Sequence, residues 1–146
     1  MAMNARCVQA QALMEYEFKD VALLQEALTA AGNPRPGLTG RTNFQGNASL
    51  AFIGDGLIRV KVGITSHRMG SSKGDTNEMW KKTASKNTLA GKCRSSGLAG
   101  YILRAPGDQV LPASTKATAA EAVIGAVFLD GGYEAASRVM ATLELV

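Results

Sequence analysis

The sequence predicts an all-α fold, and three observations lead to this prediction. Apolar residues recur at helical spacing through most of the chain. All four prolines fall outside the periodic segments, where they can end helices. Strand signals are poor, because alternating β-branched runs are few and the one Asp-Gly pair lies inside a helical pattern. We therefore expect one domain over residues 1–146, built from about six to eight helices.

The first helices are predicted from their apolar spacing and their caps. Residues 5–16 form an expected helix whose inner side carries Val8, Ala12 and either Met14 or Tyr16. Asp20 is the expected N-cap of a second helix through residues 21–31. A Gly/Pro-rich loop is expected over residues 32–46.

The centre of the chain is predicted to hold a long helix. Asn47 is its expected N-cap, and the helix runs to about Ser66. Its expected inner stripe is Leu50, Ile53, Leu57 and Val60.

The same signals predict four further helices after a break at residues 70–74. The first is a short helix capped by Asp75 that reaches Lys82, and the second covers residues 85–96 and ends at Gly97. A loop is expected over residues 104–114. The last two helices cover residues 114–129 and 133–145 and are separated by Asp130-Gly131-Gly132.

Composition narrows the function only a little. The chain has 146 residues, and 16 Lys and Arg against 12 Asp and Glu give a net charge of +4. This mild excess permits a polyanionic partner without requiring one. Cys7 and Cys93 belong to no Cys-x-x-Cys or Cys/His cluster, so we expect two buried, reduced thiols and no zinc site.

The N-terminal segment has no secretory or typical transit signature, and no apolar run approaches the roughly 18 residues of a membrane span. We expect an intracellular protein of the cytoplasm or nucleus with no membrane contact, and the mitochondrion stays open as an alternative.

Two of the expected helices each carry one acid together with neighbouring positions that share a face. On the central helix, in the stretch NASLAFIGDGLI, positions 48, 51 and 55 are spaced i, i+3 and i+7. On the helix from Ser114, in TAAEAVIGAVFLDGG, positions 118 and 121 are spaced i and i+3. Gly54 and Gly125 lie inside these helices, where a close approach of the two helices is the expected reason.

These two stretches resemble the acidic motifs of the ribonuclease III family. Two more segments, YEFKDVALLQEALT and KGDTNEMWKKTASKNTLAGKCRSSGLAGYI, resemble its opening and middle in the right order. The resemblance covers nearly the whole chain. It implies an all-α ribonuclease III endonuclease domain, here without the double-stranded-RNA-binding domain that follows it in full-length bacterial members.

The resemblance also implies a site with missing acids. The family cuts double-stranded RNA with Mg²⁺ held by acids at positions that correspond to 51, 55, 118 and 121, with a further acid at 48. Asp55 and Glu121 match this pattern and are the expected catalytic and metal-binding residues, whereas Ala48, Ala51 and Thr118 depart from it. Alanine offers no ligand, and a neutral hydroxyl is a poor substitute for a carboxylate on a hard cation. Asp108 or Asp130 could fill a gap, although no spacing argues for either.

Two surface features complete the sequence-based interpretation. Phe52 lies off the apolar stripe, and the resemblance implies a homodimer interface for it; a core residue at the edge of the stripe is the alternative. A basic face is either a solvated surface or a contact for RNA phosphates. Its residues are Arg59, Lys61, Arg68, Lys73, Lys81, Lys82 and Lys86.

The expected function is double-stranded RNA binding or processing with weak or lost nuclease activity. The first alternative is an active endoribonuclease that uses Mg²⁺, or Mn²⁺, with a reduced ligand set. The second is a structural role in a ribonucleoprotein such as a mitochondrial ribosome. RNA binding without cleavage and the structural role need no metal, whereas the active endoribonuclease does.

Overall fold

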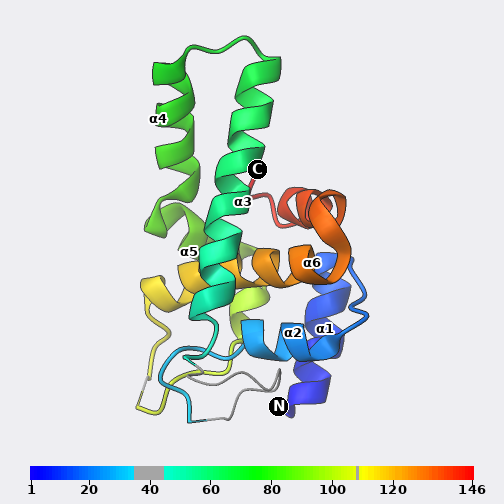
Figure 1. Cartoon of the computed structure of the whole chain (residues 1–146). Helices are drawn as coiled ribbons and strands as arrows, with labels where there is room; N and C mark the ends of the chain where they lie inside the picture. The colour runs from blue at the N-terminus through cyan, green and yellow to red at the C-terminus, as the bar shows by residue number, and fades with distance from the viewer. Residues whose placement is uncertain (35–44, 108) are drawn as a thin grey trace.

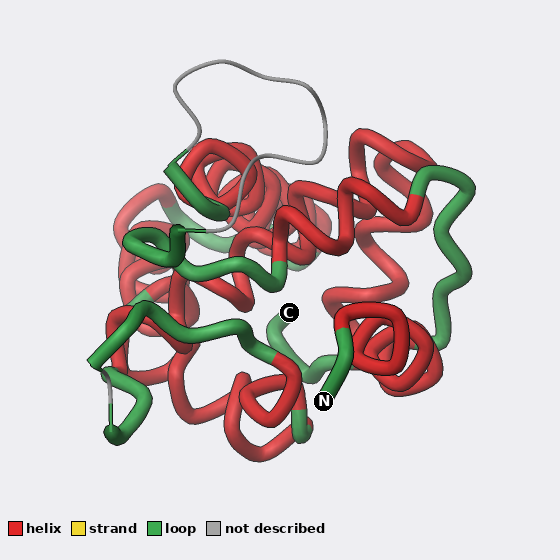
Figure 2. Tube along the Cα trace, turned by 90° about the horizontal axis from the view of Figure 1, so that it is seen from below, coloured by secondary structure: helices red, strands yellow, loops and turns green. Residues whose placement is uncertain are grey.

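The computed structural model describes residues 1–34, 45–107 and 109–146, and this part of the chain is helical without a strand (Figure 2). The predicted all-α fold is confirmed. Two isolated bridges, Thr29 with Leu103 and Gln45 with Asn47, are the extended pairings of the described residues. The helices are α1 Met3–Met14, α2 Val21–Ala27, α3 Ala48–Arg68, α4 Lys73–Ala84, α5 Lys86–Ser96, the short 3-10 helix η1 Leu98–Tyr101, and α6 Ala113–Thr142.

Helix α3 is a long central helix against which other helices pack (Figure 1). Helix α6 crosses its N-terminal half, and this is the most extensive contact between elements of the described residues. Helix α4 returns alongside the C-terminal half of α3, so that the two form a hairpin that extends beyond the helices below. The core surrounds α6 and includes Leu50 and Ile58 of α3 and Val123 and Ile124 of α6, all almost fully buried.

Three predicted helix ends are confirmed by their hydrogen bonds. The Asp20 carboxylate accepts from the backbone N–H of Ala22 at 3.1 Å, which begins α2. The Ser85 hydroxyl accepts from the N–H of Thr88 at 3.2 Å, which begins α5. Gly97, with φ 90°, ends α5 in the left-handed conformation that glycine adopts without strain.

For two predicted caps, the side chain does not make the expected hydrogen bond at the start of the helix. Asn47 precedes α3 as expected, but its amide is buried and donates to the Ala27 carbonyl at 2.9 Å, so it joins α2 to α3 and does not cap α3. Helix α4 begins two residues before Asp75, because the Ser72 hydroxyl accepts from the Asp75 N–H at 3.1 Å. Asp75 then lies in the first turn, where a negative charge favours the helix dipole.

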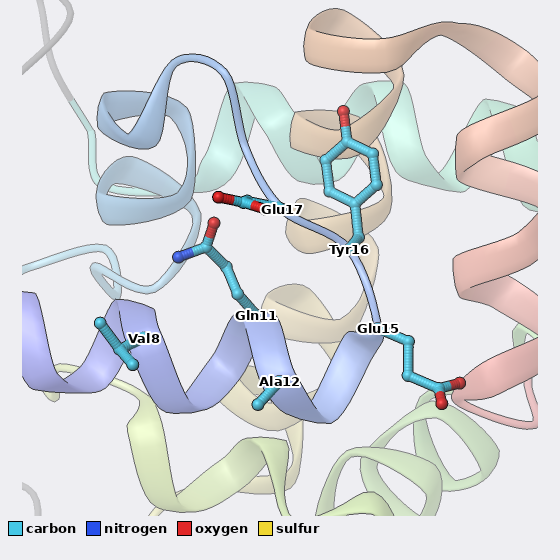
Figure 3. A pocket seen from close by; sticks show the side chains of 6 residues that line it. All are labelled: Val8, Gln11, Ala12, Glu15, Tyr16 and Glu17. Carbon is cyan, nitrogen blue, oxygen red and sulfur yellow. The ribbon is translucent and has the colours of Figure 1, made fainter.

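The predicted inner face of α1 is correct for Met14, which is fully buried, and wrong for Val8 and Ala12. Val8 is 66% exposed and Ala12 is exposed, whereas the buried face carries Met3, Cys7, Ala10 and Met14. The helix ends two residues earlier than expected because Glu15 adopts a left-handed conformation with φ 56°. Both exposed residues border an open cavity of about 460 Å³ (Figure 3). Small residues on several faces left the periodicity ambiguous.

The inner face of α3 is wider than the predicted stripe. Leu50 and Leu57 are buried and Ile53 is half-buried, but Val60 is 49% exposed. Gly54 and Ile58 take part in the buried face instead, because α3 packs between α4 and α6.

The two predicted C-terminal helices form a single α6 with a sharp bend. Gly132 lies at this bend with φ 85° and ψ −176°, a conformation that is essentially restricted to glycine. We call residues before Gly132 the first limb and residues after it the second limb of α6. The predicted loop over 32–46 lies mostly outside the described residues, and no described helix is long and apolar enough to cross a membrane.

Candidate functional site

The site lies where the first limb of α6 crosses α3. Gly54 and Gly125 form this crossing, because each presents bare backbone to the other helix. A Cβ on Gly54 would overlap the backbone carbonyl of Glu121, and a Cβ on Gly125 would overlap the carbonyl of Leu50. The predicted reason for both glycines is thus confirmed: the helices approach too closely for any side chain at these two points.

The close crossing brings Asp55 and Glu121 together. Burial, the charge of Asp55 and a hydrogen bond with Asp55 raise the pKa of Glu121 to about 7. Two carboxyl groups at such proximity repel each other when both are ionised, and this repulsion adds to burial in favouring the protonated form of Glu121. Asp55 and Glu121, the two acids predicted from the sequence, therefore lie next to each other in the structure.

The three other positions at which the resemblance places acids carry no carboxylate, and their side chains differ in environment. Ala51 is 7% exposed and belongs to the core, whereas Ala48 is exposed. The Thr118 hydroxyl donates to the backbone carbonyl of Ser114 at 2.8 Å, one turn earlier in the same helix. Within the described ranges, no group of three or more His, Cys, Asp or Glu side chains could hold a metal ion.

A small cavity without charged side chains in its lining lies beside Thr118. Its volume is about 200 Å³, and its lining combines hydroxyl and amide groups with alanine: Ala31, Asn47, Ser114, Thr115 and Thr118. Sequence reasoning missed Ser114 and Thr115. Their signal was present, because they lie four and three residues before Thr118 and so share its face.

Asp130 does not fill the gap in the ligand set. Its carboxylate accepts from the Tyr16 hydroxyl at 2.6 Å and from the backbone N–H groups of Lys19 and Asp20 at 3.0 and 2.8 Å. We call this arrangement the Asp130 clasp. Burial works to raise the pKa of Asp130, but these three hydrogen bonds together outweigh it and lower the pKa. Asp108 lies outside the described residues.

Phe52 lies on the open side of α3. It is 84% exposed, so it is not a core residue at the edge of the stripe. Gly56, one turn further along, has open space around it. This face of α3 is therefore accessible, as the predicted interface requires.

The predicted basic residues lie along the hairpin of α3 and α4 and at the start of α5. All are exposed except Lys61, which is half-buried. Arg59 stacks its guanidinium over Trp80 at 4.5 Å from the ring centre, and Lys81 forms an exposed ion pair with Glu78 at 3.6 Å. The Lys61 ammonium donates to the Ser137 carbonyl at 2.7 Å.

Known proteins similar to the chain share both its sequence and its fold. No protein-family model matches. Ribonuclease 3 of Oleidesulfovibrio alaskensis is 32% identical over 136 residues, which cover 88% of this chain and 57% of that protein. Ribonuclease 3 of Symbiobacterium thermophilum is 31% identical over 142 residues, covering 92% and 57%. The chain thus spans little more than half the length of these relatives.

A solved structure agrees with these relatives. The nuclease domain of ribonuclease III from Campylobacter jejuni superposes with a TM-score of 0.77 at 26% identity, over 92% of this chain and 93% of that one. That structure was described for the flexibility of a region involved in dimer formation.

Proposed function

The chain belongs to the ribonuclease III family, and on this basis we propose that it binds structured or double-stranded RNA and cuts it weakly or not at all. The observation that carries the proposal is the composition of the site. Two carboxylates, Asp55 and Glu121, remain at the crossing of α3 and α6, with alanine or threonine at the other acidic positions.

The donor groups at the crossing fit a catalytic Mg²⁺ poorly. Mg²⁺ takes near-octahedral oxygen coordination and can keep several waters beside one or two carboxylates, so Asp55 and Glu121 could hold an ion. The poor fit concerns catalysis, because positions 51 and 118 carry alanine and threonine where the resemblance places acids. Burial raises the pKa of Glu121, the charge of Asp55 raises it further, and a bound cation would offset the repulsion between the two carboxylates. The neutral cavity beside Thr118 supplies no further carboxylate. We derive no catalytic step through a metal from these residues.

The retained carboxylate pair favours one second candidate, an endoribonuclease with a reduced ligand set that uses Mg²⁺ or Mn²⁺. Asp55 and Glu121 would then be the metal-binding residues. Their proximity supports this candidate, whereas the buried position of Ala51 argues against efficient cleavage.

Cleavage and binding of long duplex RNA distinguish the two candidates. We expect no cutting in Mg²⁺ or Mn²⁺ and a mobility shift that weakens as salt rises. Cutting that disappears on Asp55→Ala and on Glu121→Ala would establish the second candidate instead. The absence of any shift at low salt would contradict RNA binding in both. Cleavage by the double variant Ala51→Glu with Thr118→Asp would test whether the fold can still support a working site.

We also propose that the protein is a homodimer through the open face of α3. The exposure of Phe52 supports it, and the Campylobacter jejuni relative has a region involved in dimer formation. A twofold arrangement would pair the same face of α3 from each copy.

A further inference from the structure

A second pocket lies between the C-terminal half of α3 and the second limb of α6. Its volume is about 150 Å³, which corresponds to roughly five water molecules at about 30 Å³ each. Lys61, Thr65 and Arg68 line it from α3, and Tyr133, Glu134 and Ser137 line it from α6. We call it the Lys61 pocket.

The cations of this pocket lack a counter-ion. Neither Lys61 nor Arg68 forms an ion pair with any carboxylate among the described residues, although Glu134 lines the same pocket. The Lys61 ammonium has three N–H donors, and one of them is used by the Ser137 carbonyl. Burial lowers the pKa of Lys61, and an anion bound beside the ammonium would favour its charged form.

The position of the pocket relates it to the carboxylate pair. Gly54, Lys61 and Arg68 are spaced seven residues apart, so they lie on one face of α3. Gly54 touches Glu121 on that face. Lys61 lies six residues beyond Asp55, or about 9 Å along the helix axis at about 1.5 Å per residue. The Lys61 pocket therefore lies further along α3 than the carboxylate pair, on the side of α3 that faces the second limb of α6.

An anion with several acceptor oxygens matches these donors. Ammonium and guanidinium groups form charge-assisted hydrogen bonds with phosphate oxygens, and the hydroxyl groups of Thr65 and Tyr133 can donate as well. We propose that the Lys61 pocket holds a backbone phosphate of the RNA strand next to the Asp55 and Glu121 pair. This inference rests on the RNA binding proposed above and assigns it a definite anchor point.

The salt dependence of RNA binding tests this anchor. Arg68→Gln, at an exposed position, and Lys61→Met should each weaken duplex binding about tenfold at low salt. Each should also reduce the slope of log K against log salt by about one. Arg94→Gln removes an exposed cation of α5 and serves as the control, with a smaller effect. Glu134→Gln removes a negative charge from the pocket and should tighten binding.

The inference is overturned if Arg68→Gln and Lys61→Met behave like Arg94→Gln in affinity and slope while all variants stay folded. If the unaltered protein binds no RNA, the proposed function fails, and RNA cannot be what supplies the phosphate to this pocket. Titration with inorganic phosphate, followed by amide NMR shifts of Thr65 and Tyr133, then tests separately whether the pocket binds an anion. Shifts that vanish in Arg68→Gln support it, and no shifts refute it.

Discussion

At the scale of single residues, two glycines determine how close the carboxylates come. Gly54 and Gly125 let the backbones of α3 and α6 touch, and this contact places Asp55 beside Glu121. The sequence indicated a close approach at these glycines. It could not indicate the hydrogen bond from Thr118 to Ser114, because a hydroxyl on a helix can either donate to the preceding turn or face a cavity.

Gly54→Ala should destabilise the protein by about 1–3 kcal/mol or more, because the new methyl group would overlap the Glu121 carbonyl. Gly56→Ala, two residues away in the same helix, is the matched control. It has open space and should stabilise by up to about 1 kcal/mol through helix propensity. Urea unfolding of both variants measures the difference. Equal effects at the two positions would contradict the close crossing.

Glu121→Gln should remove a pH dependence of stability. The pKa of Glu121 is raised to about 7 in the folded state from its ordinary value of 4.5, so the folded protein binds the proton more tightly than the unfolded chain. Stability from this group is fully present below about pH 4.5 and is lost as pH rises to about 7. The melting temperature, measured in chelating buffer across this range, should fall less steeply in the variant.

The control for this measurement is Glu78→Gln, which changes an exposed carboxylate paired with Lys81. Its pH profile should follow that of the unaltered protein. A Glu121→Gln profile with an unchanged slope would show that the carboxyl pair does not share a proton.

At the scale of secondary-structure elements, the Asp130 clasp fixes α2 against the bend of α6. The bend needs Gly132, and Gly131 beside it lies so close that a Cβ there would overlap the Tyr16 hydroxyl. Local signals predicted the break at these residues. The partners of Asp130 could not be predicted, because Tyr16 and Lys19 lie more than a hundred positions away in the chain.

Asp130→Asn should destabilise the protein by about 1.5–3 kcal/mol, the range for hydrogen bonds to a charged group. Tyr16→Phe should cost less, and the double variant should cost less than the sum of the two, because both changes disrupt one interaction. Chemical unfolding of all four proteins gives the coupling energy. Strict additivity would contradict the clasp. Because the pKa of Asp130 is lowered, its stabilisation is present above its unfolded pKa and declines on acidification.

Helix positions were predicted more accurately than their faces. Strong stop and start signals at Asp20, Ser85 and Gly97 placed three ends correctly. The face of α1 was partly wrong because alanine and valine suit both a core and an open groove. Asn47 was misassigned because a buried amide can satisfy a distant carbonyl as well as its own helix.

At the scale of the whole molecule, the open face of α3 is where a second copy would dock. Phe52→Ala should therefore convert a dimer into a monomer, as measured by sedimentation or light scattering over a range of concentrations. Met69→Ala, an exposed residue at the end of α3, is the control and should leave the mass unchanged. The dimer proposal fails if the unaltered protein already has the mass of a monomer, or if Phe52→Ala stays dimeric.

The burial of Ala51 has a consequence for any attempt to add an acid to the site. A glutamate introduced there alone would bring a third carboxyl group beside Asp55 and Glu121, at a position that is 7% exposed. Without a bound cation, its charge would be buried unpaired, so Ala51→Glu by itself should destabilise the protein. An acid at this position needs a cation or a compensating change beside it.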